Sequence, residues 1–191
     1  MLPPILYQDE DLLVVHKPAG LMVHRSTLDW YEHDSVLDRL REGLPPHETV
    51  QLAPAHRLDK GTSGLLVFTL NTTAARRMGE LFETGQVHKR YLALVRGWPA
   101  PAGRCEHPLA RDPERPSQGQ TQLPALTDYR RLAHVEWPLA VDARHPTARY
   151  ALVEAIPHTG RRHQIRRHFK HLSHPLIGDA THGKGPHNRA V

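Results

Sequence analysis

The chain has 191 residues, with 25 Lys and Arg against 20 Asp and Glu and a formal net charge of +5. This length suits one domain with a substantial core. The single cysteine, Cys105, excludes a disulfide within the chain and a thiolate cluster for zinc, so we expect a reducing, cytoplasmic compartment. The sequence shows no secretory leader and no stretch near the roughly 20 apolar residues of a membrane span, so we expect no membrane partner.

The first part of the chain predicts two strands with a helix between them. An apolar run predicts a strand over residues 12–16. Ser35 is a suitable N-cap for a helix over residues 36–42, which Gly43 would end. The hexamer LLVFTL at residues 65–70 is too short for an independent helix and does not alternate, so it predicts a strand covered on both faces.

The rest of the chain continues the alternation of helix and strand. Asn71 can cap a helix over residues 72–84 with an apolar stripe along one side. Apolar patterns predict three further strands, at 91–96, 126–132 and 150–156. Residues 99–124 are rich in proline, glycine and charge, which indicates an exposed excursion from the sheet. This order of elements favours an α+β fold around a mixed or antiparallel sheet.

A helix near the C-terminus combines an apolar stripe with a basic face. Ile165, Phe169 and Leu172 fall at i, i+4 and i+7, so we expect them on one buried side. Arg162 and Arg166, with Lys170, fall at successive i+4 steps, where like charges repel, so something anionic should compensate them.

Positive charge is concentrated at the end of the chain. Residues 157–191 carry seven cations against one carboxylate, Asp179, and the preceding residues are close to neutral. Such a block favours contact with the phosphates of a nucleic acid. A solvated basic tail is the alternative interpretation.

Residues 56–64, HRLDKGTSG, place a single carboxylate, Asp59, in the turn that leads into the predicted strand at 65–70. Thr62, Ser63 and Gly64 are suited to a tight turn that holds the preceding loop in one shape. Rigid loops often carry catalytic groups. A weak ion pair between Arg57 and Asp59 on the surface is the alternative.

Four spaced motifs resemble those of the RluA-type pseudouridine synthases, which isomerise uridine to pseudouridine in RNA. They are HRLDKGTSG at 56–64, LVVHKPAGLMVH at 13–24, KRYLA at 89–93 and GRRHQIRRH at 160–168, in the family's order. The resemblance implies a central sheet with flanking helices and a central active-site cleft. It also implies that residues 1–191 form a single catalytic domain, monomeric and lacking the family's extreme C-terminal segment.

The resemblance also implies roles for individual residues. Asp59 matches the catalytic aspartate, Arg166 the basic residue that pairs with it, and Tyr91 the active-site tyrosine that stacks on the target base. Ile165 matches the apolar residue on the pocket floor, and Arg57 the residue that replaces the flipped base. Contacts with RNA phosphates would then fall to Arg161, Arg162 or Arg167. From the residues alone, Tyr91 could instead be an ordinary core tyrosine.

The implied reaction breaks the bond from C1′ to N1, turns the uracil and joins C1′ to C5. It is neither redox nor hydrolytic, so no cofactor is needed in principle. One carboxylate is the minimum equipment, because it can attack C1′ as a nucleophile or remove the 2′ proton to give a glycal. The sequence leaves both routes open.

Two rival classes and two substrates remain at this point. His168, His171 and His174, with Asp179, could be imagined as metal ligands of a hydrolase, although no zinc-protease pattern is present. A non-catalytic RNA-binding module would use the basic helix without needing Asp59. Residues 174–189 resemble the branch of the family that modifies uridine 65 of tRNA, which we rank above ribosomal RNA.

Overall fold

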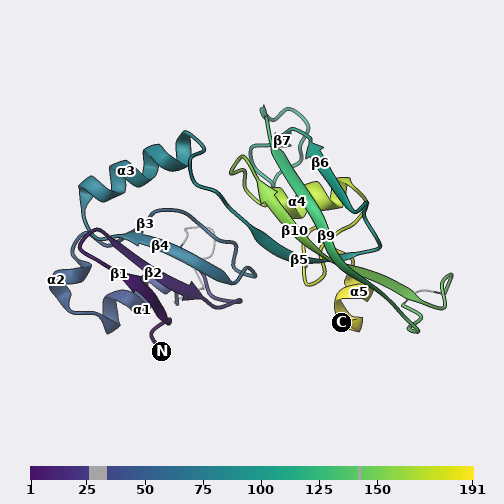
Figure 1. Ribbon diagram of the computed structural model, residues 1–191, viewed down its shortest axis with the longest axis horizontal. Helices are drawn as coiled ribbons and strands as arrows, with labels where there is room; N and C mark the ends of the chain where they lie inside the picture. Colours follow the sequence, from purple (N-terminus) through teal and green to yellow (C-terminus); the bar gives the residue numbers. More distant parts are fainter. Residues whose placement is uncertain (26–33, 142) are drawn as a thin grey trace. The chain divides into compact units, whose positions relative to one another are not determined.

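The computed structural model describes residues 1–25, 34–141 and 143–191. The chain divides into two compact units, Met1–Gln86 and Val87–Val191, each built around its own antiparallel sheet (Figure 1). Within the described ranges, no helix is both long and apolar enough to cross a membrane. The structure therefore has the α+β character that the sequence predicts.

The first unit has a four-stranded antiparallel sheet in the order β1-β2-β4-β3. Its strands are β1 (Ile5–Gln8), β2 (Leu12–Lys17), β3 (Ala53–Pro54) and β4 (Gly64–Thr69). Its helices are α1 (Val36–Gly43), α2 (Pro46–Thr49) and α3 (Thr72–Glu83). The predicted strands at 12–16 and 65–70 are thus confirmed, with bounds that shift by one residue.

The expectation that the β4 strand is covered on both faces is wrong at the beginning of the strand, although Thr69 at its end is buried on the second face. Leu66 and Phe68 are fully buried and pack with Leu13 and Val15 of β2, whereas the side chain of Leu65 is 62% exposed. Alternate residues of a strand point to opposite faces, so one face of this antiparallel sheet makes the core. The unbroken apolar run concealed this two-residue period.

Both predicted helix starts in this unit are confirmed by their caps. The Ser35 hydroxyl accepts a hydrogen bond from the amide of Asp38, 3.2 Å away, at the start of α1. The side-chain carbonyl of Asn71 accepts one from the amide of Ala74, 2.8 Å away, at the start of α3. Each cap satisfies one of the amides that a first helical turn leaves without a partner.

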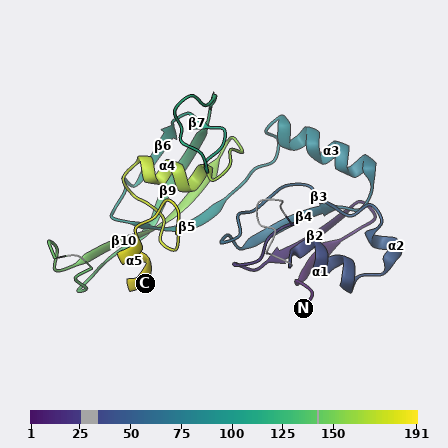
Figure 2. The ribbon, with the colours of Figure 1, turned by 180° about the vertical axis from the view of Figure 1, so that it is seen from behind.

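The second unit has a four-stranded antiparallel sheet in the order β5-β10-β9-β6, beside the two-stranded ribbon β7-β8. The strands are β5 (Tyr91–Arg96), β6 (Ala102–Glu106), β7 (Leu109–Ala110), β8 (Gln122–Leu123), β9 (Leu126–Trp137) and β10 (Ala148–Pro157). The helices are α4 (Gln164–His171) and α5 (Gly185–Ala190). Strands β9 and β10 run on together beyond their neighbours as a long hairpin (Figures 1 and 2).

The predicted excursion at 99–124 is wrong in its first part. Residues Ala102–Glu106 form strand β6, which pairs along β9 with Cys105 opposite Thr127. The remainder carries the short ribbon β7-β8 and a loop between its strands. The segment AGRCE has no apolar alternation of its own, so pairing with β9 decides its conformation.

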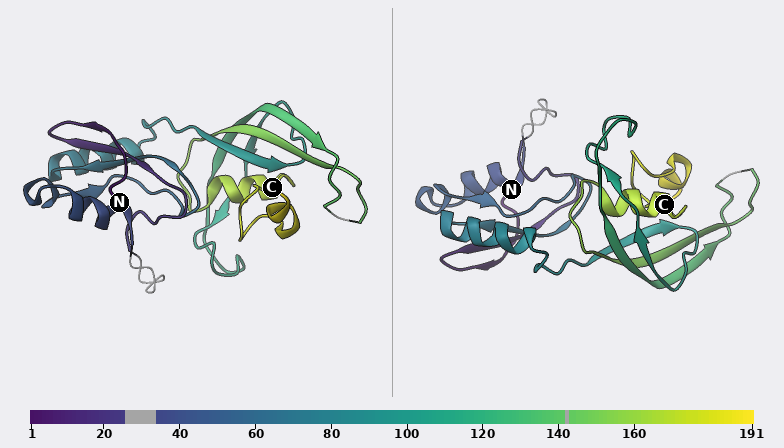
Figure 3. Two further views of the ribbon diagram at one scale, coloured as in Figure 1. Left: turned by 90° about the horizontal axis from the view of Figure 1, so that it is seen from below. Right: turned by 90° about the horizontal axis from the view of Figure 1, so that it is seen from above.

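Helix α4 packs on one face of this sheet (Figure 3). Phe169 is 1% exposed and joins Val95 and Val153 in the core of the unit. The fully buried ring of His168 is hydrogen-bonded to Thr127 Oγ1 of β9, 2.9 Å away, and to the His107 carbonyl, 3.0 Å away. These contacts fix α4 against the sheet and against the segment that follows β6.

Candidate active site and RNA-binding residues

Asp59 lies in the turn between β3 and β4 and is partly buried. Its carbonyl accepts a hydrogen bond from the amide of Thr62, 2.9 Å away. The next carbonyl, that of Lys60, accepts one from the amide of Gly20, 2.8 Å away, and Gly20 has the positive φ of 86° that favours glycine. The loop after β2 therefore holds the backbone on which Asp59 is carried.

Lys17, the last residue of β2, is fully buried beneath this turn. Its ammonium donates to three carbonyls, those of Pro18 at 2.9 Å, Leu21 at 2.5 Å and Lys60 at 3.1 Å. Burial lowers the pKa of Lys17 to about 8, while the charge of Asp59 acts in the opposite direction. The ammonium thus links the loop after β2 to the Asp59 turn and contributes positive charge near the carboxylate.

Sequence reasoning missed Lys17 as a site residue, although the motif that contains it was recognised. Leu13, Val15 and Lys17 occupy alternate positions of β2, and all three are fully buried. A lysine at an inward position of a strand needs polar partners in the interior. That periodicity is the signal that could have found it.

The residues just before Asp59 divide between core and surface. Leu58 packs against the core of the first unit, whereas Arg57 is exposed. Burial lowers the pKa of the His24 ring, and the positive charge of Arg57 lowers it further, so this cation lies near His24. The ring of His56 accepts a hydrogen bond from the amide of Val67, 3.2 Å away, and so ties the loop to β4.

Tyr91 is the first residue of β5, opposite Ala155 of β10, and packs against the core of the second unit. The preceding residue, Arg90, pairs with the buried carboxylate of Glu154, with 2.9 Å between Arg90 Nε and Glu154 Oε1. Arg130 approaches the other oxygen of Glu154 at 3.3 Å. Two guanidinium groups on one buried carboxylate hold the beginning of β5, and with it Tyr91, in place.

Gln164 organises the turn that leads into α4. Its side-chain oxygen accepts from the hydroxyl of Thr159 at 2.7 Å and from the amide of Arg161 at 3.0 Å. Its amide nitrogen donates to the carbonyl of Leu126 at 3.0 Å and to Thr127 Oγ1 at 2.9 Å. The next residue, Ile165, packs against the core, so the network sets the position of the first turn of α4.

Arg166 forms a bidentate ion pair with Asp179. Arg166 Nε lies 2.8 Å from Asp179 Oδ2, and Arg166 Nη2 lies 2.8 Å from Asp179 Oδ1. Burial of Asp179 opposes its ionisation, but the bonds from Arg166 and from the amides of His182 and Thr181 lower its pKa to about 2. The carboxylate fixes the plane of the guanidinium and leaves Nη1 outside this pair.

The three arginines predicted to contact phosphates are all bonded to residues 110–124. Arg161 Nε donates to the Pro124 carbonyl at 2.9 Å, and Arg167 Nη1 donates to the Ala110 carbonyl at 2.9 Å. Arg162 pairs with Glu114. Helix α4 begins at Gln164, so Arg162 lies before the helix and the expected helical stack of three cations is wrong.

The histidines considered as metal ligands have other roles. The His171 ring stacks on His107 with 3.8 Å between ring centroids, and His174 Nδ1 lies 2.9 Å from the Arg96 carbonyl. His168 is held inside the unit as described above. Across residues 1–25, 34–141 and 143–191, no group of three or more potential ligands gathers in a way that could hold a metal ion.

The structure therefore places Asp59 and Arg57 in the first unit and the other predicted site residues in the second. Within the second unit, Ile165 and Arg166 adjoin in the first turn of α4, with Arg161, Arg162 and Arg167 on either side. Asp179, considered at first only as a metal ligand, is the partner of Arg166.

Comparison with known proteins gives consistent results. Residues 11–171 match the RNA pseudouridylate synthase family. A curated protein of Pasteurella multocida (strain Pm70), named tRNA pseudouridine synthase C, is 46% identical over 198 residues, which cover 98% of this chain and 77% of that protein. The protein of the same name from Vibrio cholerae is 44% identical over 190 residues, covering 97% of this chain and 76% of that protein.

Solved structures agree with the sequence matches. Human RNA Pseudouridylate Synthase Domain Containing 1 superposes with a TM-score of 0.76 at 30% identity, covering 98% of this chain and 72% of that chain. Human RNA Pseudouridylate Synthase Domain Containing 4 gives a TM-score of 0.71 at 29% identity, covering 95% and 69%. The chain therefore belongs to the RNA pseudouridylate synthase family, is of its RluA type, and is an isomerase.

Proposed function

We propose that this enzyme converts uridine to pseudouridine in tRNA, at uridine 65. The observation that carries the choice of substrate is the 46% identity, over 98% of this chain, to a protein named tRNA pseudouridine synthase C. The resemblance of residues 174–189 to the branch that modifies uridine 65 supports the choice of position. Ribosomal RNA is the second candidate substrate, because other branches of the family act on it.

Asp59 is the proposed catalytic carboxylate. It attacks C1′ as N1 departs, and the ester bond breaks when C5 joins C1′. Alternatively, it removes the 2′ proton as N1 departs to give a glycal, and it returns that proton to C2′ when C5 joins C1′. In both routes C5 then loses its proton and N1 gains one. Both routes need Asp59 ionised and held in one position. The Lys17 ammonium, bonded to the adjacent Lys60 carbonyl, supports this assignment through its charge and through its hold on the turn.

We assign the remaining roles from the family resemblance. Arg166 is the cation that keeps Asp59 ionised, and its pair with Asp179 orients the guanidinium for this task. Tyr91 stacks on the uracil, and Ile165 forms the floor beneath it. Both side chains pack against the core of the second unit, which keeps an apolar surface in a defined position.

Two further contacts with RNA are proposed. Arg57, exposed beside the Asp59 turn, enters the RNA stack in place of the flipped uridine and so offsets part of the cost of unstacking. Arg161, Arg162 and Arg167 contact backbone phosphates. We also propose that the enzyme acts in the cytoplasm as a monomer, with residues 1–191 forming one catalytic domain.

The decisive experiment detects pseudouridine by carbodiimide-dependent primer stops. Unmodified tRNA and ribosomal RNA are incubated with the wild type and with the isosteric variant Asp59→Asn. We expect a stop at position 65 of tRNA that the variant loses completely, because the neutral amide can neither attack C1′ nor accept the 2′ proton. A tRNA with cytidine at position 65 is the matched substrate control.

Other results would point elsewhere. A stop found only in ribosomal RNA would show that the chain is a pseudouridine synthase whose substrate is ribosomal RNA and not tRNA. Tight tRNA binding that Asp59→Asn leaves intact, with no stop in either RNA, would favour the binding module. Retention of activity by Asp59→Asn would remove this aspartate from the mechanism.

A further inference from the structure

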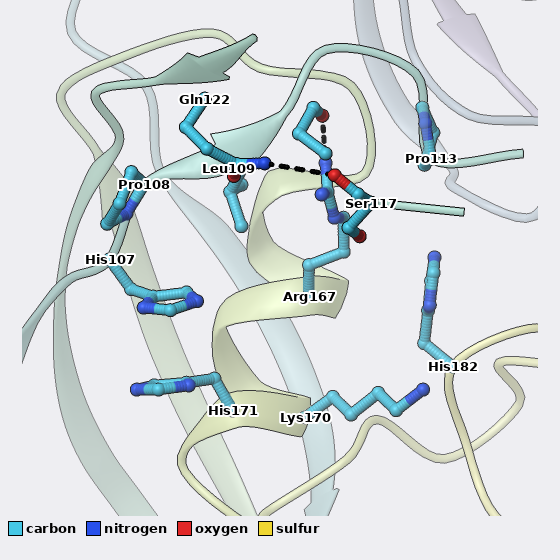
Figure 4. Close-up of a pocket in the computed structure, with 11 residues that line it drawn as sticks. His107, Pro108, Leu109, Pro113, Ser117, Gln122, Arg167, Lys170, His171 and His182 are labelled. Atoms are coloured by element: carbon cyan, nitrogen blue, oxygen red, sulfur yellow. Dashed lines mark hydrogen bonds between the residues drawn. The ribbon is translucent and has the colours of Figure 1, made fainter. Parts of the chain in front are cut away.

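A cavity of about 510 Å³ lies between α4 and the segment that follows β6, within the second unit (Figure 4). We call it the α4 pocket, and its principal residues are His107, Pro108, Leu109, Arg167, Lys170 and His171. None of the residues proposed above to act on the uracil is among the described residues that line it. The pocket therefore offers a surface that the proposed reaction does not use.

The lining of the α4 pocket is cationic. Arg167 and Lys170 come from one side of α4, and His182 lies across from Lys170 (Figure 4). No Asp or Glu occurs among the described residues that line the pocket. Two carboxylates in the vicinity already have cationic partners, since Glu114 pairs with Arg162 and Asp179 with Arg166. The pocket thus presents positive charge to whatever enters it.

The guanidinium of Arg167 is held in a position from which it can bind an anionic ligand. Its Nη1 donates to the Ala110 carbonyl, which fixes the guanidinium, and a guanidinium has further donors in the same plane. Burial lowers the pKa of Arg167 from a very high ordinary value, so the group remains charged. Lys170 is exposed and can move onto an anion held by Arg167.

Another wall of the pocket contains two histidine rings, His171 from α4 and His107 from the segment after β6, which lie against each other so that one face of each ring is covered. The His107 and His171 rings stack with 3.8 Å between centroids and an interplanar angle of 13°. Burial lowers the pKa of His107, and the charges of His171 and Arg167 lower it further, which favours a neutral ring. Pro108 and Leu109 continue this wall. The backbone of His107 is anchored by the buried His168 ring, so the wall is held in place.

A cationic corner beside a wall with histidine rings suits one chemical class of ligand, a nucleotide. RNA-binding proteins commonly stack unpaired bases on aromatic or histidine rings and hold the adjoining phosphate with arginine or lysine. A volume of about 510 Å³ falls within the usual range of small-ligand pockets, roughly 300 to 1,000 Å³, and exceeds what a lone phosphate needs.

We propose that the α4 pocket receives one nucleotide of the substrate RNA outside the target uridine, with its phosphate on Arg167 and Lys170 and its sugar or base against His107. This proposal rests on the proposed function, because it takes the ligand to be part of the same RNA. It adds Lys170, His107 and His171 to the RNA-binding residues. Lys170 would then bind, together with Arg167, the phosphate that Arg167 was expected to contact.

The test compares Lys170→Gln and His107→Ala with the wild type in binding unmodified tRNA at several salt concentrations. Lys170→Gln should weaken binding several-fold and reduce the steepness of the salt dependence by about one released ion. His107→Ala should weaken binding by roughly 5- to 100-fold with the salt dependence unchanged, because it removes a stacking surface and no charge.

Two controls separate the pocket from general effects. Arg76→Gln removes a cation from the exposed surface of α3, where the side chain is 81% exposed, and should leave tRNA affinity within about twofold of the wild type. Lys170→Arg keeps the charge, so its tRNA affinity and the salt dependence of that affinity should match those of the wild type. Thermal unfolding checks that each variant is folded, which we expect because Lys170 is exposed and the His107 carbonyl is retained.

The outcomes distinguish failure of this proposal from failure of the proposed function. If the wild type modifies tRNA but Lys170→Gln and His107→Ala bind it as the wild type does, the pocket proposal is overturned and the function stands. If no pseudouridine forms but both variants still lose tRNA affinity, the function fails and the pocket remains an RNA site. A third outcome is that uridine monophosphate shifts the NMR resonances of His107 and His171 while both variants bind tRNA as tightly as the wild type does. The pocket would then bind a free nucleotide, and the RNA proposal would be overturned.

Discussion

The Asp59 turn and the beginning of α4 hold functional groups by opposite means. In the turn, the side chain of a single buried cation, Lys17, is bonded to three backbone carbonyls and so positions the main chain. At α4, side chains pair with side chains, as in the bidentate contact of Arg166 with Asp179. The first arrangement joins three carbonyls through one side chain, one of them 43 residues away, whereas the second joins a single pair of residues 13 positions apart. Loss of Lys17 should therefore do more damage than loss of either partner at α4.

Lys17→Met should have the largest effect on stability in this comparison. The substitution keeps roughly the length of the side chain but removes the ammonium from three carbonyls, of which, among the described residues, only that of Lys60 keeps another donor, the amide of Gly20. We expect the free energy of unfolding to fall by about 3 kcal/mol, as for a buried charged group with several hydrogen bonds, and pseudouridine formation to fall with it. Urea unfolding and primer-stop assays measure the two effects.

His16→Gln is the matched control for Lys17→Met. His16 is the neighbouring residue of β2 and is exposed on the other face. Its substitution should change the free energy of unfolding by less than about 0.5 kcal/mol. If Lys17→Met were as mild as this control, the Asp59 turn would not depend on Lys17.

Asp179→Asn should have the next largest effect. The amide keeps much of the shape but loses the charge that faces Arg166, whose side chain is only 19% exposed. We expect a loss of about 2 kcal/mol in the free energy of unfolding of the second unit. Asp128→Asn is the control, because Asp128 also has a pKa lowered to about 2, by hydrogen bonds from Arg104 and His158, but its side chain is 30% exposed. A loss below about 1 kcal/mol is expected there.

Both regions should gain stability as the pH rises, but in different pH windows. The pKa of Asp179 in the folded chain, about 2, is below its ordinary value of 3.8, so this contribution to stability is present above pH 4 and is lost as the pH falls toward 2. The pKa of Lys17 is lowered from 10.5 to about 8, so the unfolded chain binds more protons between these values and stability rises with pH there. The difference in unfolding free energy between the wild type and Asp179→Asn, measured against pH, isolates the contribution of Asp179. The difference between the wild type and Lys17→Met isolates that of Lys17. A difference that did not vary across its window would refute the assignment.

Arg162→Gln should have the smallest effect. Arg162 pairs with Glu114, but the two side chains are 35% and 47% exposed, and exposed ion pairs contribute about 0 to 1 kcal/mol. We expect less than about 1 kcal/mol of lost stability by urea unfolding. A loss as large as that of Asp179→Asn would show that the loop carrying Glu114 is more strongly coupled to α4 than its exposure indicates.

Local sequence signals predicted several elements well. Strand β5 was predicted with its observed bounds, and the starts of α1 and α3 followed from Ser35 and Asn71. In each case the signal is contained within a few residues, as an apolar run or a cap. Strand β6 was missed because AGRCE becomes a strand only through pairing with β9.

The same distinction applies to the candidate site. The motifs at 13–24, 56–64, 89–93 and 160–168 identified the family and indicated the residues that are proposed for its site. The partners of those residues were found only in the three-dimensional structure. Asp179 follows Arg166 by 13 positions, and Glu154 is separated from Arg90 by 64, so no local pattern relates them.

By itself, the sequence determined the family, the α+β class, the helix caps and the identity of the proposed catalytic aspartate, because each depends on residue types at short, fixed spacing. Only the tertiary structure decided that Lys17 supports the Asp59 turn, that Asp179 orients Arg166, and that α4 and the segment after β6 enclose a cationic pocket. These features arise where chain segments distant in sequence pack together, and burial then requires each charged group to find a partner.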